Sequence, residues 1–312
     1  MPNHLSLSNL TSWPFFGISL ALFGALLITP DTLFMRLSGF DGWPMVSWRG
    51  LEMGGLLLCL WLIIFRGQLG ADLQQLRTRT GFAAIICQSS GSVFFILAVA
   101  ETSVALVLFC LATIPIFAAI FSAILIGERT KTATWITMLV AFAGIGIAVL
   151  DGESTKSVMA QGSGAVWLGT VYALSAAACV GTSFVFIRMN EKLNIVLMSG
   201  CQASMTGILG LCVLMATEGG LSQLTAGHIG YISVNGLLIL PLSFVCLSWA
   251  SRYTQAANVG LLMLLETILG PIWVWLGVGE AVSVQMIIGG AITVIALAIY
   301  ISATAMSETA SS

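Results

Sequence analysis

The chain has 312 residues, of which 58% are hydrophobic and 8% are charged, and its mean hydropathy is +1.03. About 25% of the residues of a soluble domain are charged, so this composition excludes a water-soluble globular protein and predicts one that crosses a membrane several times. The formal net charge is −2 and no basic stripe is present, so no nucleic-acid partner is expected.

Ten apolar stretches are each long enough to cross a bilayer, since a spanning helix needs about 20 mainly apolar residues. They lie at 14–36, 43–65, 80–99, 102–127, 133–151, 164–187, 193–216, 229–250, 253–278 and 283–304. Two boundaries divide apolar runs that are too long for one span, and Glu101 and Arg252 mark the turns there. The sequence therefore predicts an all-α membrane protein with ten transmembrane helices.

The longest polar stretches lie at 66–80, 151–164 and 218–228. We expect all three to be loops. The second, DGESTKSVMAQGSG, is rich in Gly and Ser and lies at the midpoint of the chain, as a linker between two halves would. The predicted division is a first half at 1–151, a linker at 152–163, and a second half at 164–312 that includes a short C-terminal tail.

Lys and Arg are unevenly distributed over the loops. If the N-terminus is inside, the outside loops hold only Arg36 and Lys156. The inside loops then hold Arg66, Arg77, Arg79, Arg129, Lys131, Arg188, Lys192 and Arg252. Cytoplasmic loops carry an excess of Lys and Arg, so both termini are predicted to be cytoplasmic, in a multi-pass protein of a cell membrane that we expect to be a bacterial inner membrane. The first 13 residues contain no Lys or Arg, so no cleaved signal peptide is expected.

The two halves repeat one another at an offset of 152 positions. Residues 98–128 align with 250–280 without a gap, and both copies end in Gly-Glu. Glu128 and Glu280 are expected to be structural, with Glu128 pairing locally beside Arg129. Because each repeat holds five helices, an odd number, the second must lie upside down relative to the first. Inverted repeats are typical of secondary transporters, which bind substrate near the bilayer midplane between the repeats.

The repeated stretch also carries a family resemblance. The run A-x-x-x-T-(S/Q)-x-A, followed by Pro115 and by Gly-Glu ending thirteen residues after that proline, resembles the EamA-type repeat of the drug/metabolite transporter superfamily. The second copy, LLETILGPIWVWLGVGE followed by IIGGAITVIALAIY, resembles that family's C-terminal repeat. The resemblance covers about 14–303. It implies a ten-helix transporter with a central cavity, of a family that often exports amino acids or other small metabolites. The usual proline after Leu-Glu is replaced by Thr267, and the proline comes at 271, so a kink is expected one turn further along.

Charged residues inside a bilayer cost about 2.5–3.5 kcal/mol each on insertion scales, so they usually face a cavity and mark function. Arg49 and Glu52 lie three residues apart in the second predicted helix, on one face. In one interpretation Arg49 binds a substrate carboxylate or other anion, and Glu52 carries a proton or acts as a counter-charge. In the other, the two form a structural pair that neutralises itself.

Glu266 lies near the middle of the ninth predicted helix. Desolvation favours the neutral form of a carboxyl group, which suits proton coupling; the alternative is a protonated side chain that bonds a neighbouring helix. Pro30 removes a backbone donor and should bend or break the first helix near its outer end. Pro30 and Asp31 are therefore candidates for an extracellular gate, and the alternative is local capping of a helix end.

Three uncharged side chains complete the candidate binding residues. Gln88 and Gln202 lie within the third and seventh predicted helices, where each can bond substrate or join helices. Trp273 lies deep in the ninth and can line an aromatic wall of a cavity, and the alternative is that it faces lipid or packs in the core. Gly50 and Gly54 form a GxxxG pattern that permits close helix packing, either within one chain or between two copies in a homodimer.

No cofactor or metal site is expected, because the seven cysteines lie in apolar segments without CxxC or Cys/His spacing. No catalytic motif is present, so the chain is not expected to be an enzyme. The predicted function is secondary active transport of small metabolites, with the bilayer, a small-molecule substrate and protons as partners, by proton-linked export through alternating access. A gradient-driven facilitator or uptake carrier is the alternative, and a non-transporting receptor or assembly protein is a remote one.

Overall fold

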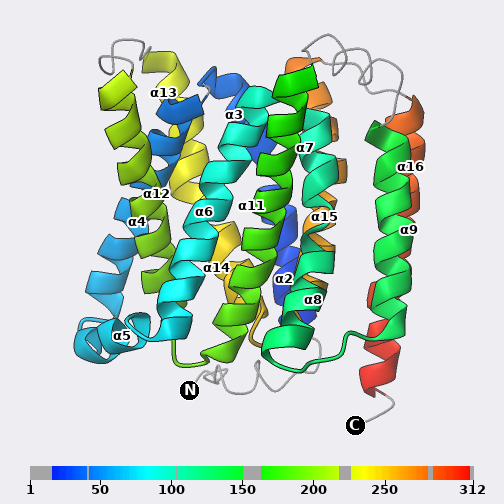
Figure 1. Ribbon diagram of the computed structural model, residues 1–312, viewed down its shortest axis with the longest axis horizontal. Coiled ribbons are helices and arrows are strands. Elements are labelled where there is room, and N and C mark those ends of the chain that lie inside the picture. The colour runs from blue at the N-terminus through cyan, green and yellow to red at the C-terminus, as the bar shows by residue number, and fades with distance from the viewer. Residues whose placement is uncertain are drawn as a thin grey trace, which may run out of the picture.

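The computed structural model describes residues 16–40, 42–102, 104–149, 163–217, 226–279 and 284–309. All regular structure in these ranges is helical, and Figure 1 shows long helices running side by side. The first half contains α2 (Phe16–Ile28), α3 (Asp31–Ser38), α4 (Gly42–Ile64), α5 (Leu69–Leu76), α6 (Arg79–Glu101), α7 (Val104–Leu111), α8 (Ile114–Leu125) and α9 (Thr132–Val149). The second contains α11 (Ser163–Met189), α12 (Ile195–Thr217), α13 (Ala226–Val234), η1 (Asn235–Ile239), α14 (Leu240–Ala250), α15 (Ala256–Val278) and α16 (Val284–Thr309).

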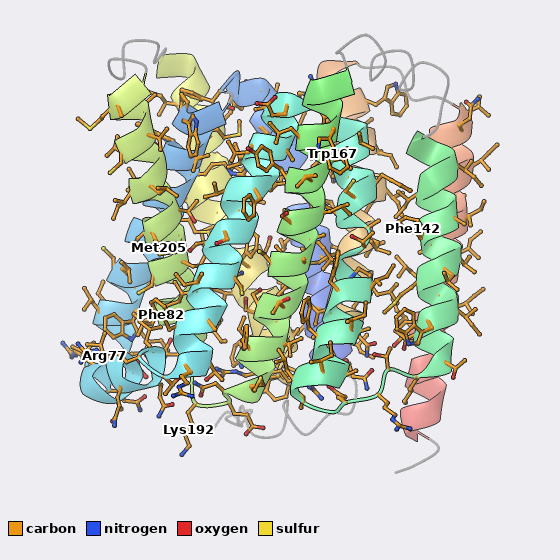
Figure 2. All side chains as sticks on the ribbon, viewed as in Figure 1. Arg77, Phe82, Phe142, Trp167, Lys192 and Met205 are labelled. Atoms are coloured by element: carbon orange, nitrogen blue, oxygen red, sulfur yellow. The ribbon has the colours of Figure 1, made fainter. Side chains whose placement is uncertain are left out.

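Eight spans of the described chain are long and apolar enough to cross a membrane, and two shorter apolar helices lie at Thr132–Ile147 and Ile287–Ile301. Together they correspond to the ten predicted helices. Large apolar side chains remain exposed around the bundle, among them Phe82, Trp167 and Met205 (Figure 2). Lipid solvates such a surface, so the all-α membrane fold is confirmed.

Proline interrupts three of the spans. Pro30 separates α2 from α3, and the Thr29 hydroxyl satisfies a carbonyl at this break by donating to Leu26 O at 2.8 Å. The predicted break of the first helix is therefore confirmed. The fourth span divides into α7 and α8 just before Pro115, and the eighth contains the π-helical η1 followed by Pro241. By contrast, α15 continues through Pro271.

The polar stretch at 66–80 differs from the expected loop, because it contains the short helix α5. Asp72 explains why the helix packs: its Oδ2 accepts hydrogen bonds from Trp61 Nε1 at 2.7 Å and from Asn194 Nδ2 at 2.9 Å. A charged residue thus becomes buried at 6% exposure and joins α5 to both halves. The predicted linker at 152–163 lies almost wholly outside the described residues, as does Glu280.

The helix contacts follow the two repeats. At an offset of 152, α4 corresponds to α12, α8 to α15, and α9 to α16, and the members of each pair pack against one another. The contact of α6 with α11 has its equivalent in the contact of α14 with α2. Thr293 Oγ1 also donates to Ala141 O at 3.2 Å, which joins equivalent positions directly. This packing is that of two repeats related by a pseudo-two-fold axis.

The GxxxG pattern is used within the chain. A Cβ on Gly50 would lie 2.6 Å from the Cα of Gly207, and one on Gly54 would meet the backbone of Ser204. Both glycines therefore allow α4 to approach α12 closely, so the GxxxG pattern serves helix packing within one chain.

Candidate functional site

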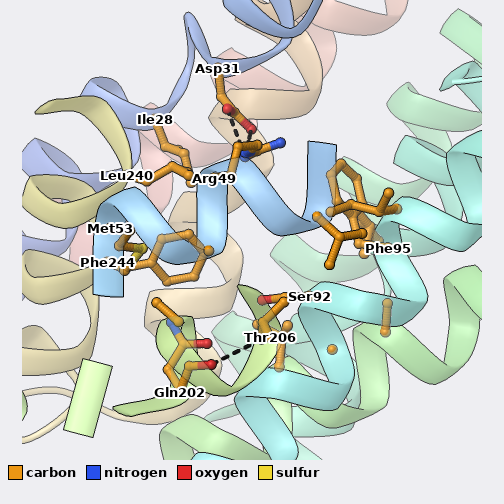
Figure 3. A pocket seen from close by; sticks show the side chains of 18 of the residues that line it. Ile28, Asp31, Arg49, Met53, Ser92, Phe95, Gln202, Thr206, Leu240 and Phe244 are labelled. Atoms are coloured by element: carbon orange, nitrogen blue, oxygen red, sulfur yellow. Dashed lines mark hydrogen bonds and ion pairs between the residues drawn. The ribbon is translucent and has the colours of Figure 1, made fainter. Parts of the chain in front are cut away.

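A cavity of about 110 Å³ lies between the two repeats (Figure 3). Engineered cavities of about 150 Å³ hold a benzene-sized molecule, so the space suits a small solute. Five pairs of its lining residues occupy equivalent positions in the two repeats: Ile28 and Val180, Gly50 and Gln202, Ser92 and Phe244, Leu111 and Met263, Ile114 and Glu266. The repeats thus supply a shared frame whose side chains differ.

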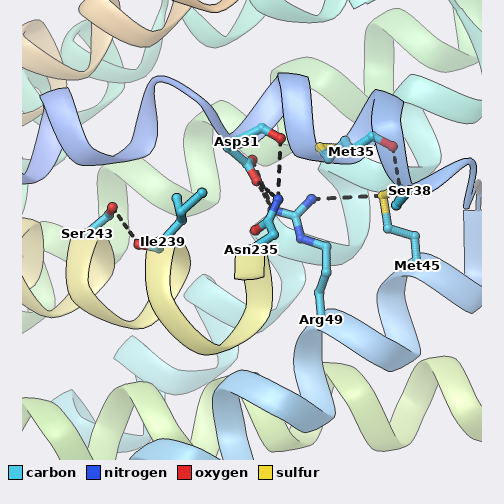
Figure 4. A network of polar contacts seen from close by, with 8 residues as sticks. All are labelled: Asp31, Met35, Ser38, Met45, Arg49, Asn235, Ile239 and Ser243. Atoms are coloured by element: carbon cyan, nitrogen blue, oxygen red, sulfur yellow. Dashed lines mark hydrogen bonds and ion pairs between the residues drawn. The ribbon is translucent and has the colours of Figure 1, made fainter. Parts of the chain in front are cut away.

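A buried polar cluster borders this cavity (Figure 4). Arg49 Nη2 lies 2.9 Å from both carboxylate oxygens of Asp31, and Asn235 Nδ2 donates to Asp31 Oδ1 at 2.5 Å. The exposed fractions of Asp31, Arg49 and Asn235 are 2%, 8% and 1%. The cluster ties together α3, α4 and η1, and Asp31 and Arg49 neutralise one another there. A buried charge is tolerated because it is both paired and hydrogen-bonded.

Local structure explains how Asp31 and Asn235 reach this place. Pro30 ends α2, so that Asp31 begins α3 inside the bundle rather than continuing along the α2 axis. Asn235 begins the π-helical turn that precedes Pro241, whose ring cannot donate a backbone hydrogen bond. Short π-helical turns often occur at functional sites. The equivalent of Asn235 in the first repeat is Ala83, inside the uninterrupted α6, so the turn is specific to the second repeat.

Glu266 lines the cavity from α15. It interacts electrostatically with Asp31 and Arg49. Among the described residues, none forms a hydrogen bond or an ion pair with its carboxyl group. Glu266 is therefore the lining carboxyl whose oxygens remain free for a proton or a solute.

Gln202 and Thr206 form a second polar wall on α12. The Gln202 carbonyl accepts hydrogen bonds from Ser89 Oγ and Thr206 Oγ1, each at 3.0 Å. Its side-chain Oε1 is buried and accepts no hydrogen bond from a described residue. A buried oxygen without a partner can accept a hydrogen bond from an N–H or O–H group of a solute.

Glu52 does not pair with Arg49. Its Oε1 accepts a hydrogen bond from Ser233 Oγ at 2.5 Å, and a Cβ on Gly236 would lie 2.6 Å from its Oε2. Arg49 turns instead toward Asp31, which α3 presents to it. The interpretation of Arg49 and Glu52 as a self-neutralising pair is therefore wrong, and the Glu52 carboxyl lies against α13 and η1 rather than along the cavity.

The other predicted residues separate into two groups. Asp31, Arg49, Gln202 and Glu266 line the cavity. Outside its described lining lie Pro30, Glu52, Gln88 and Trp273. The Gln88 amide is fully buried without a hydrogen-bond partner among the described residues, and Trp273 Nε1 donates to Thr29 Oγ1 at 2.9 Å. Trp273 thus forms a hydrogen bond beside the break at Pro30, and the residue is 40% exposed.

Asn235 is the cluster residue that the sequence interpretation missed. A polar amide six residues before a proline, in an otherwise apolar span, was the available signal. Glu128 makes a local contact, as expected, because its Oε2 accepts a hydrogen bond from Ser122 Oγ at 3.1 Å. Its ion pair, however, is with Arg188 Nη2 at 2.9 Å rather than with Arg129. Arg188 also donates to Thr254 O at 2.5 Å, so this contact joins the end of α11 to the turn before α15.

Comparison with known proteins agrees with this architecture. The EamA-like transporter family matches residues 15–150 and 167–302, one copy in each half. An uncharacterized transporter from Clostridium kluyveri is 24% identical over 191 residues, which are 61% of this chain and 60% of that protein, so the chain spans less than two thirds of that relative.

A crystal structure of another protein shares the fold, with a TM-score of 0.72 at 17% identity, over 91% of this chain and 96% of that one. The family matches cover most of the chain and are those of transporters, not enzymes. The chain belongs to the EamA-like transporter family.

Proposed function

We propose that the chain is a secondary active transporter of small organic solutes, such as amino acids or other small metabolites, and that it exports them by alternating access in exchange for protons. The observation that carries this proposal is the cavity between the repeats, with the free carboxyl group of Glu266 in its wall. Substrate sites of inverted-repeat transporters lie at the repeat interface. An ionisable residue inside the membrane is a candidate for proton transfer.

In this mechanism Glu266 carries the proton. It lies on α15, while its electrostatic partners Asp31 and Arg49 lie on α3 and α4. A change in the protonation of Glu266 therefore changes the electrostatic interaction between helices of opposite repeats, which is what coupling to a rocking motion requires. Glu52, the other predicted proton carrier, is less suited to this role because its carboxyl group lies away from the cavity and contacts Ser233.

Arg49 has a different role from the predicted anion receptor. One guanidinium nitrogen of Arg49 already donates hydrogen bonds to both oxygens of Asp31, and Asn235 donates a hydrogen bond to the same carboxylate. We infer that Arg49 positions α3 against α4 and sets the charge of the cavity. Asp31 then acts at the cavity wall, while Pro30 sets the break in the first span that brings Asp31 there. The outer gate predicted for Pro30 and Asp31 thus becomes a coupling between this break and the site.

We further propose that both termini are cytoplasmic, in a bacterial inner membrane, with halves at 1–151 and 164–312 joined by a linker at 152–163. The support is the distribution of cations. Arg66, Arg77, Arg79 and Lys192 are exposed. Figure 2 shows Arg77 and Lys192 at the same end of the bundle. Positive residues gather on the cytoplasmic side of membrane proteins.

The test uses purified protein in proteoliposomes loaded with a panel of labelled amino acids, amines and organic acids. An imposed pH gradient is expected to drive movement of at least one solute against its own gradient, with proton movement in the opposite direction. The Glu266→Gln variant is expected to lose this dependence. Transport that runs only down the solute gradient in the wild type would instead establish the facilitator alternative.

A further inference from the structure

We propose that the solute is a small organic monocation, a protonated amine with an apolar body, which binds at Glu266 in exchange for the proton carried there. This inference rests on the proposed function, because it names the substrate class of the same cavity. The evidence for it is the set of charged residues that line the cavity, two of which already form an ion pair with one another.

The described lining contains three charged residues: Asp31, Arg49 and Glu266. The Asp31 carboxylate and the Arg49 guanidinium cancel each other's charge through two contacts of 2.9 Å. The net charge of the lining is therefore set by Glu266 alone. It is zero when Glu266 is protonated and minus one when it is ionised.

An uncompensated charge is costly in a space removed from bulk water. A monocation that enters as the Glu266 proton leaves keeps the total at zero, with an O–H bond broken on Glu266 and a proton passed to water. An anion beside protonated Glu266 makes the total minus one. Electroneutrality thus favours the exchange of one cation for one proton.

A zwitterion meets the same difficulty. Its ammonium group needs ionised Glu266, and its carboxylate then needs a cation of its own. Arg49 could supply one only by releasing Asp31, which Asn235 also holds at 2.5 Å. Releasing it would leave a buried carboxylate without its partner, which is strongly unfavourable. An amine without the carboxylate avoids this cost.

The remaining walls define the body of the solute. Phe95, Leu111, Phe244 and Met263 give the cavity an apolar surface on the α6, α7, α14 and α15 sides. A compact apolar group gains free energy by leaving water for this surface. Gln202 Oε1 supplies one further acceptor for an N–H group. The volume of about 110 Å³ is smaller than that of a cavity that holds benzene, so the combination suits a short, compact alkylamine.

The groups facing Glu266 make its role testable. Of the helices packed against α15, α3 presents Asp31, and α4 presents Arg49 across the cavity. The helices α2, α8 and α11 also pack against α15. Their described lining residues are Ile28, Ile114, Ala176 and Val180, which do not titrate. The helices α9 and α16 contribute no described lining residue. The protons released on binding therefore measure the ionisation of Glu266.

The experiment compares four probes of one compact skeleton: isobutylamine, isobutanol, 3-methylbutanoate and valine. Binding to the purified full chain in detergent is measured by titration calorimetry in two buffers of different ionisation enthalpy, which gives the protons released. We expect isobutylamine to bind most tightly and to release about one proton, since one site titrates. Glu266→Gln is expected to lose the proton release and about tenfold or more in affinity, as for a lost hydrogen bond to a charged group.

Two further variants guard the interpretation. Glu191→Gln, at an exposed carboxyl in the turn after α11, is expected to behave as the wild type. Glu266→Asp keeps the carboxyl and is expected to retain proton release, so that loss in Glu266→Gln cannot be assigned to misfolding; size-exclusion profiles of all variants are compared.

The proposal is overturned if valine or 3-methylbutanoate binds at least as tightly as the amine, or if the amine binds without releasing a proton. Its failure is distinct from failure of the proposed function. Proton-driven transport of an anion or a neutral solute, with no binding of the amine, would remove the substrate class and keep the transporter mechanism. If the amine binds with release of a proton but no solute moves in proteoliposomes, the ligand class is kept and the transport function is removed.

Discussion

Ile114 and Glu266 occupy equivalent positions in the two repeats, and both line the cavity between them. The same helical frame therefore presents a methyl-bearing side chain from α8 and a carboxyl group from α15. Because the frame is shared, the difference in chemistry lies in the side chain rather than in the backbone. This pair gives a direct way to ask which repeat supplies the coupling group.

We expect Glu266→Gln to abolish the dependence of transport on the pH gradient, because the amide cannot release a proton. Glu52→Gln is expected to keep this dependence, since the Glu52 carboxyl lies against Ser233 outside the cavity. Solute flux into proteoliposomes with and without a pH gradient measures both. A loss of gradient dependence in Glu52→Gln alone would assign the proton to α4 instead.

The ion pair of Asp31 with Arg49 is expected to stabilise the fold only while both partners are present. Removing one partner of a buried pair costs about 3–5 kcal/mol, because the other charge is left uncompensated. Asp31→Leu should therefore lower the unfolding free energy by about that amount, measured in detergent. The double variant Asp31→Leu with Arg49→Met should recover most of it, whereas additive losses would contradict a coupled pair.

Gly50 should be far less tolerant of substitution than Gly55 in the same helix. A Cβ on Gly50 would lie 2.6 Å from the Cα of Gly207, whereas a Cβ on Gly55 would have nothing within 4 Å. We expect Gly50→Ala to destabilise by about 1–3 kcal/mol through overpacking between α4 and α12. Gly55→Ala serves as the matched control, and thermal unfolding followed by light scattering or fluorescence compares them. Equal midpoints for the two variants would show that α12 moves away freely.

The proposed orientation can be tested by labelling. Arg36 and Lys192 are both exposed. The proposed orientation puts Arg36 outside and Lys192 inside. In a background without the native cysteines, Arg36→Cys is expected to react with a membrane-impermeant maleimide in intact cells. Lys192→Cys is expected to react only after permeabilisation, and the reverse pattern would invert the topology.

Much of the fold could be predicted from the sequence for a simple physical reason. A bilayer imposes a length and an apolar composition on each span, and both are properties of local sequence. The break at Pro30 was equally local, because proline lacks the backbone donor that the helix needs. The offset of 152 predicted the inverted repeats without any knowledge of contacts.

The pairing of the charges could not be predicted in this way. Arg49 and Glu52 are three residues apart, and spacing along one helix placed them together. The structure separates them because α3 brings Asp31 to Arg49, while α13 and η1 bring Ser233 and Gly236 to Glu52. These contacts span 18 and 181 positions for Arg49–Asp31 and Glu52–Ser233.

The sequence by itself thus determined that this protein lies in a membrane, in ten helices, as two inverted halves, since these follow from hydrophobicity and repetition. Only the tertiary structure decided how the described intramembrane ionisable groups pair. Electrostatic pairing depends on distances between helices that meet across the repeat interface. Among the described lining residues, those distances leave Glu266, and not Arg49, as the ionisable group without an ion-pair partner.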